Sequence, residues 1–177
     1  AMVRSDRLAP VVRAMLHTIL ARVHAESGRA EDAVARVGAA DEEFHHVDPR
    51  NNPPNMFWYD GAEHAEHTGQ ALAALAVRGG SAAEAADRLG SAITGFGDTQ
   101  ARSRALCQLR LASLTMAVGD PREAAAIGGD AVAAAGAIRS HRVTEDLRRL
   151  GGTATPHAGI PEVAHLRHQI DTAVAGA

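Results

Sequence analysis

Histidine and glutamate side chains gather in one short stretch with the spacing that metal sites and acid–base catalysts use. Glu42 with His45, and Glu43 with His46, both follow the pattern Glu-x-x-His. A di-iron site in a helical bundle requires that pattern on two different helices, together with two further glutamates. Here the two patterns overlap on adjacent helical positions and point to different sides. We therefore expect no di-iron centre.

A second histidine cluster follows the proline-rich residues 47–56. His64 and His67 lie three residues apart and Glu63 precedes His67 by four, a spacing that places neighbours on one side of a helix. A zinc site accepts looser arrangements, and the two clusters could meet across a helical hairpin. Exposed polar histidines with pH-sensitive packing are the interpretation we favour. We expect no bound metal and no cofactor.

Three consecutive aromatic residues, Phe57, Trp58 and Tyr59, stand out in a chain that is only 3% aromatic. They follow the proline-rich stretch directly, and Asp60 comes next. One interpretation is that the rings cap an apolar pocket with Asp60 as its polar partner. The interpretation we favour is that they anchor the preceding loop as part of the structural core.

Motifs of the common enzyme classes are absent from the sequence. It has no nucleophile elbow, P-loop, dinucleotide fingerprint or zincin pattern. Cys107 lies on the apolar face of a predicted helix, which indicates an inert core thiol. An arginine-rich segment near the C-terminus is partly balanced by Glu145 and Asp146, which favours a solvated face: Arg139, Arg142, Arg148 and Arg149. We therefore expect a protein that is not an enzyme.

The composition excludes several classes of protein. With 177 residues the chain can bury a core as one domain, and a single cysteine cannot form an intramolecular disulfide. The net charge of −3 is far from the basic balance of a nucleic-acid-binding chain. All 18 cationic residues are arginine, a usage typical of a GC-rich, actinobacterial source. No signal peptide or long apolar run is found, so we expect a cytoplasmic protein without membrane contact.

The hydrophobic pattern predicts an all-α fold with about eight helices. Alanine dominates the apolar residues, and no alternating run of β-branched and aromatic residues predicts a strand. The helices are expected over residues 9–26, 30–44, 58–77, 81–95, 99–118, 121–138, 140–150 and 161–174. The prolines exclude a helix over 47–56, and residues 151–159 are expected to be a loop. In the first helix, Val11, Met15, Ile19 and Val23, or Leu16 with Leu20, recur at helical spacing.

One pattern occurs three times at identical offsets. A leucine is followed by alanine, then by glycine eight residues after the leucine, and by alanine thirteen and twenty residues after it. The leucines are Leu20, Leu72 and Leu111, the glycines Gly28, Gly80 and Gly119, and the later alanines Ala33, Ala85, Ala124, Ala40, Ala92 and Ala131. We expect the leucine to pack inside a helical hairpin, the glycine to turn its corner, and the alanines to seat the second helix.

This pattern resembles the tetratricopeptide repeat, a helical hairpin with a unit of 34 residues. The resemblance covers roughly residues 14–132 and implies a single domain over 1–177, made of antiparallel hairpins stacked as a short α-solenoid. The implied units are residues 14–47, 61–97 and 99–138, followed by irregular helices over 139–175. The copies lie 52 and 39 residues apart, and the family's large aromatics are replaced by His17, Gly69, Gln108, His24, Ala76 and Thr115.

A narrower resemblance is carried by the segments WYDGAEHAEHTGQALAAL, ARSRALCQLRLASLTMAVGDPREAA and SHRVTEDLRRL. They are similar to the C-terminal tetratricopeptide-like region of actinobacterial helix-turn-helix transcriptional regulators. Such regulators also carry an N-terminal DNA-binding domain, and no segment of that kind is found in this sequence. The resemblance implies a module that binds a peptide, small metabolite or protein partner and makes no direct contact with nucleic acid.

The resemblance also implies where a partner would bind, because the first helices of such units line a concave groove. Converging arginines in that groove would suit a carboxylate, such as a peptide C-terminus or an acidic metabolite. The groove positions fall on Arg22, His67, Gln70, Arg110 and Ser113. The full set of candidate binding residues adds the aromatic segment and its histidine: Trp58, Tyr59, Asp60 and His64.

Two other functions stay open. A small α-helical enzyme would have a closed pocket near Trp58–His67, with Arg110 beside it and a histidine or glutamate of perturbed pKa. A homodimerisation domain would use an apolar, alanine-rich face and bind no ligand.

Overall fold

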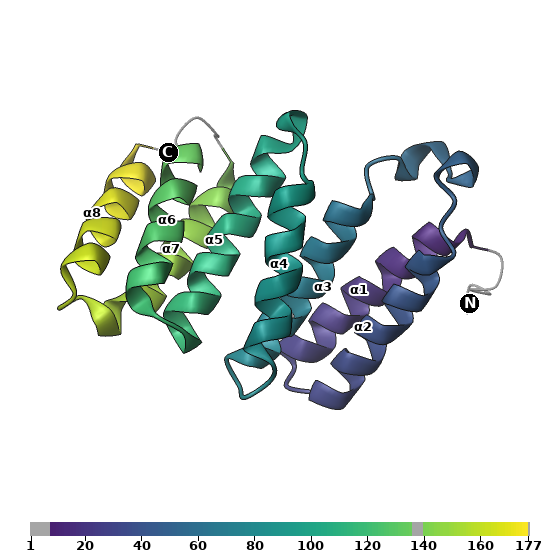
Figure 1. Ribbon diagram of the computed structural model, residues 1–177, viewed down its shortest axis with the longest axis horizontal. Helices are drawn as coiled ribbons and strands as arrows, with labels where there is room; N and C mark the ends of the chain where they lie inside the picture. The colour runs from purple at the N-terminus through teal and green to yellow at the C-terminus, as the bar shows by residue number, and fades with distance from the viewer. Residues whose placement is uncertain (1–7, 136–139, 177) are drawn as a thin grey trace. The chain divides into compact units, whose positions relative to one another are not determined.

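The computed structural model describes residues 8–135 and 140–176, and every regular element within these residues is helical (Figure 1). The all-α prediction with about eight helices is therefore confirmed. The elements are α1 (Pro10–Glu26), α2 (Ala30–His45), η2 (Pro49–Asn51), η3 (Pro54–Met56), α3 (Gly61–Ala76), α4 (Ala82–Gly95), η4 (Asp98–Gln100), α5 (Ala101–Val118), α6 (Pro121–Ala135), α7 (His141–Ala154), η5 (Thr155–His157) and α8 (Pro161–Ala175).

The chain divides into two compact units, residues 1–92 and 93–177, and the boundary falls inside α4. In the first unit α1 packs against both α2 and α3. In the second unit α5 packs against α6 and α7, and α8 packs against α6 and α7. A helix that contacts its own hairpin partner and the next hairpin is typical of repeat folds. The single domain over 1–177 and a solenoid that continues through both units stay predictions.

The segment before α3 contains more structure than its prolines suggest. Prolines exclude an α-helix over residues 47–56, but η2 and η3 are short 3₁₀-helices that begin at Pro49 and Pro54. A proline fits the first position of such a turn because its missing N–H would have no partner there. Helix α3 then begins at Gly61 and not near Trp58, because Asp60 caps it.

The prediction of a loop over residues 151–159 is wrong in part. Helix α7 continues to Ala154, and η5 follows it directly. Gly151 and Gly152 do not end the helix, because Leu150 before them and Ala154 after them are both fully buried. Burial on one helix face outweighs the cost of two glycines, about 1 kcal/mol each. Residues 136–138 of the predicted sixth helix and Arg139 lie outside the described part of the chain.

Small residues form much of the core. The alanines of the repeated pattern at thirteen and twenty residues after the leucine are all fully buried: Ala33, Ala85, Ala124, Ala40, Ala92 and Ala131. Gly28 turns the corner between α1 and α2 with a φ of 76°, a backbone conformation that favours glycine. The expected burial of the leucine is confirmed for Leu72 and wrong for Leu20, which is 41% exposed.

Candidate functional site

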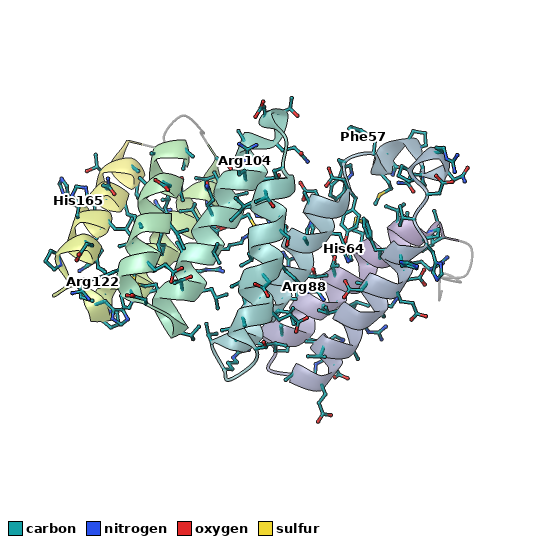
Figure 2. The ribbon with its side chains drawn as sticks, viewed as in Figure 1. Phe57, His64, Arg88, Arg104, Arg122 and His165 are labelled. Carbon is teal, nitrogen blue, oxygen red and sulfur yellow. The ribbon has the colours of Figure 1, made fainter. Side chains whose placement is uncertain are left out.

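The start of α3 positions most of the predicted site residues. Asp60 is its N-cap, and Oδ1 of Asp60 accepts hydrogen bonds from the backbone N–H groups of Ala62, at 2.9 Å, and Glu63, at 3.0 Å. A cap of this kind is worth about 1 kcal/mol and fixes where the helix begins. Tyr59 therefore lies just before the helix, and His64 lies in its first turns (Figure 2).

His64 joins Tyr59 to Asp41 of α2 through two hydrogen bonds. Its Nε2 lies 2.8 Å from Oδ1 of Asp41, and its Nδ1 lies 3.1 Å from the hydroxyl of Tyr59. With the proton on Nε2, the ring donates to the carboxylate and accepts from the phenol. Phe44 stacks on the imidazole at a centroid distance of 4.2 Å. The prediction of exposed histidines is thus wrong for His64, which is buried between these groups.

Arg88 of α4 holds the same carboxylate from the other side. Its Nη1 donates to Oδ1 of Asp41 at 2.9 Å and its Nη2 donates to Oδ2 at 2.8 Å, a bidentate pair. The guanidinium also donates to Thr68 of α3 at 3.1 Å and to Glu84 at 3.2 Å. Asp41 thereby links α2, α3 and α4 through its hydrogen bonds with His64 and Arg88. Figure 2 labels these two partners.

The surroundings shift the pKa values of two of these groups in opposite directions. Partial burial raises the pKa of Asp41, but the hydrogen bonds from His64 and Arg88 outweigh it and hold that pKa far below its usual range. Burial raises the pKa of Tyr59 well above that of a free phenol, and the nearby carboxylates of Glu63 and Asp41 add to this rise. Asp41 is therefore ionised and Tyr59 neutral at neutral pH.

The three aromatic residues do not act together. Tyr59 is buried, but Phe57 is 84% exposed and Trp58 is 40% exposed. The interpretation of all three as core anchors is therefore wrong for Phe57. Nε1 of Trp58 donates to the backbone carbonyl of Asn55 at 3.0 Å, and its ring meets that of Tyr59 edge to face.

Three side chains on α3 could together hold a metal ion. Glu63, Glu66 and His67 each offer one ligand atom, and these atoms lie within 4.8 Å of one another. Nε2 of His67 lies 3.8 Å from Glu63 and 3.7 Å from Glu66. Two oxygens and one nitrogen suit a divalent ion such as zinc. Sequence reasoning identified Glu63 and His67 and missed Glu66, although its spacing of three residues from Glu63 was available; the absence of a metal stays a prediction.

The remaining predicted residues are divided between the two units. In the first unit, Nε of Arg22 lies 3.9 Å from Oε1 of Glu26. Oε1 of Gln70 is buried without a hydrogen-bond partner among the described residues. In the second unit, Ser113 donates to a backbone carbonyl of its own helix at 2.8 Å. Nε of Arg110 lies 3.2 Å from Oδ2 of Asp146. Burial lowers the pKa of Arg110 to about 10, against the opposing effect of the Asp146 carboxylate.

Helix α1 carries an exposed apolar surface that sequence reasoning did not single out. We name it the α1 stripe: Leu16, Ile19, Leu20 and Val23, each between 39% and 44% exposed. The residues of α1 that are buried are Val11, Ala14, Thr18, Ala21 and Ala25. Successive side chains of a helix are rotated by about 100° around its axis, so the exposed set and the buried set project on average in directions about 180° apart. The helix therefore packs through its small side chains and turns most of its large apolar ones to solvent.

No protein-family model matches the chain. No curated protein and no solved structure shows significant similarity to it. The resemblance to tetratricopeptide-like regulators therefore stays a prediction. In residues 8–135 and 140–176, none of the helices has the length and apolar character needed to cross a membrane.

Proposed function

We propose that the chain is a regulatory binding module that recognises a protein partner through the α1 stripe. The observation that carries this proposal is the exposure of Leu16, Ile19, Leu20 and Val23 on one side of a helix whose other side is fully packed. Monomeric proteins rarely expose large contiguous apolar patches, and the patches that they do expose often mark interaction sites.

The stripe fits a short amphipathic helix. From Leu16 to Val23 it spans about 10 Å, or two helical turns, at about 1.5 Å per residue. It contains no charged residue, while Arg22 and Glu26 stand near its C-terminal end. An uncharged apolar centre with a polar rim is the usual composition of a protein interface. The partner should therefore present two or three large apolar side chains at a spacing of three to four residues.

The polar groups around His64 favour a binding module over an enzyme. Both ring nitrogens of His64 and both carboxylate oxygens of Asp41 already have partners inside the protein. A general base must be within hydrogen-bond reach of a substrate proton. Groups engaged in this way support the packing of α2, α3 and α4, and this supports the expectation of no catalysis.

The regulatory part of the proposal rests on the resemblance to helix-turn-helix regulators. In such a protein the module would lie beside a DNA-binding domain in the cytoplasm and alter its activity when the partner binds. The chain itself would contact neither DNA nor membrane.

A double substitution in the stripe tests the proposal. Ile19→Asp with Leu20→Asp should abolish capture of one defined protein from an extract of the source organism and leave the circular dichroism spectrum unchanged. The control is Val34→Asp on α2, a valine that is 54% exposed and lies outside the stripe. Capture by the double variant at the wild-type level would contradict the proposal.

A second copy of the chain is the other candidate occupant of the stripe. The same apolar surface would then form a homodimer. Light scattering at micromolar concentration distinguishes a homodimer from a monomer that binds a different protein. We expect the monomer mass of 18.4 kDa. A doubled mass that returns to 18.4 kDa in the Ile19→Asp, Leu20→Asp variant would instead establish the homodimer.

A further inference from the structure

A cavity of about 280 Å³ lies between α7 and α8 in the second unit. Its walls come from both helices, with Arg148, Gly151 and Gly152 on α7, and Arg167 and Ile170 on α8. The volume is just below the range of about 300–1,000 Å³ that is usual for small-molecule sites. The cavity therefore has room for a small molecule and not for a folded partner.

Two glycines of α7 line this cavity. A Cβ atom at Gly152 would meet no other atom within 4 Å, and one at Gly151 would touch only Ile170, at an ordinary 3.5 Å. Alanine would therefore fit at both positions and would stabilise α7 by about 1 kcal/mol at each. Packing therefore does not require glycine at Gly152, and a larger side chain there would project into open space.

The charge of the cavity favours an anion. Arg148 and Arg167 both line it, and neither forms a hydrogen bond or ion pair with another residue in the described part of the chain. Asp171 also lines the cavity and likewise has no such partner there. One positive charge is thus in excess, and two guanidinium groups offer the fork of N–H donors that binds a carboxylate.

Apolar side chains form the remaining wall. Ile170 is buried, Val174 is half-buried, and both line the cavity. A ligand that places its charge between the arginines would lay its uncharged part against these side chains. Burial of apolar surface would add to the affinity that the charge supplies.

We propose that the cavity between α7 and α8 is a binding site for a small organic monocarboxylate with a short apolar tail. Arg148 and Arg167 bind the carboxylate, Ile170 and Val174 contact the tail, and Gly152 forms part of the α7 wall. The site is built entirely from the second unit and does not depend on the α1 stripe. If both exist, the module has one surface for a protein partner and another for a small effector.

Hexanoate and benzoate are suitable probes, followed by amide chemical shifts of the isotope-labelled full chain at millimolar ligand. Both should shift resonances of α7 and α8. Arg148→Gln and Arg167→Gln should each weaken binding about tenfold or more, since each removes a charge-assisted hydrogen bond. Gly152→Leu should abolish binding, because the leucine side chain would occupy the cavity. The variant should stay folded, because leucine has a higher helix propensity than glycine.

The matched control is Arg149→Gln, which removes a charge from the next residue of α7 outside the cavity and should leave binding unchanged. Circular dichroism confirms that each variant is folded. The proposal is overturned if neither probe shifts the resonances of α7 and α8, or if Arg149→Gln weakens binding as much as Arg148→Gln. Equal affinity for hexanoate, acetate and inorganic phosphate would overturn the assignment of an apolar tail.

Discussion

Asp41 joins three helices through one carboxylate. It accepts hydrogen bonds from His64 on α3 and from both terminal nitrogens of Arg88 on α4. Removing it leaves a buried imidazole and a half-buried guanidinium without their acceptor, which costs more than the bonds themselves contribute. Since the side chain of Asp41 is 38% exposed, solvent screens part of that loss.

Asp41→Ala should therefore lower the free energy of unfolding by about 1–2 kcal/mol in urea titrations. Glu42→Ala is the matched control, because Glu42 is the next residue of α2 and is exposed. Alanine has a higher helix propensity than either residue and gains more over aspartate than over glutamate, so a lower stability of Asp41→Ala cannot come from helix propensity. Equal stability of the two variants would show that the network around Asp41 contributes nothing.

Tyr59 provides a pH test with a clear sign. Its pKa is raised in the folded protein because the phenol is buried, whereas in the unfolded chain it should be about 10. The unfolded state thus loses this proton first, so the stability that Tyr59 contributes is complete below about pH 10 and is lost as the pH rises above it.

Because the chain has one tyrosine and one tryptophan, the phenolate absorbance and Trp58 fluorescence each report one residue. We expect phenolate to form at about pH 10 in urea, and in buffer only together with unfolding. Phenolate near that pH in a folded protein would contradict the buried assignment.

The sequence was informative about some residues of the site and silent about others. The histidine spacing and the aromatic run drew attention to Tyr59 and His64, which do lie together. Asp41 and Arg88 were missed because they are 47 residues apart and no local pattern joins them. Asp60 was singled out as a pocket residue, although an aspartate three residues before Glu63 is also the pattern of a helix cap.

At the scale of elements, the helices follow from local chemistry, but the face that each one buries does not. In α1, the large residues at helical spacing suggested an ordinary core face. The structure instead buries Ala14, Ala21 and Ala25 and exposes Leu16 and Leu20. Alanines in the buried face allow neighbouring helices to approach closely, and a count of large apolar residues overlooks that face. The number of helices was therefore predictable from the sequence, and the face of α1 that is buried was not.

Two neighbouring glycines of α6 test how tightly the second unit is packed. A Cβ atom at Gly128 would come within 2.9 Å of Leu166 and 3.2 Å of Leu150, both buried, whereas one at Gly129 would meet only Gln169, at 3.7 Å. Gly129→Ala should stabilise the protein by up to about 1 kcal/mol. Gly128→Ala should be less stable than Gly129→Ala by about 1–3 kcal/mol because of overpacking. Urea titration of both variants measures this difference, and equal stability would mean that α6 and α8 are loosely packed there.

At the scale of the molecule, the chain combines two packed units with surface features that packing does not explain. The first unit exposes the α1 stripe, and the second contains the arginine-lined cavity. The core of each unit is built mainly from small and aliphatic residues, as the composition indicated. Which surfaces face a partner could not be read from the composition, because apolar residues of the stripe and of the core are the same types.

The recognition of a partner through α1 is tested most directly by a photo-reactive amino acid placed at position 20 of the full chain. Irradiated in an extract of the source organism, this variant should crosslink to one defined protein, and adding Ile19→Asp should remove the crosslink. The same photo-reactive residue at position 34, on α2, should give no such product. The account is contradicted if position 20 yields no crosslinked protein, or if positions 20 and 34 yield the same one.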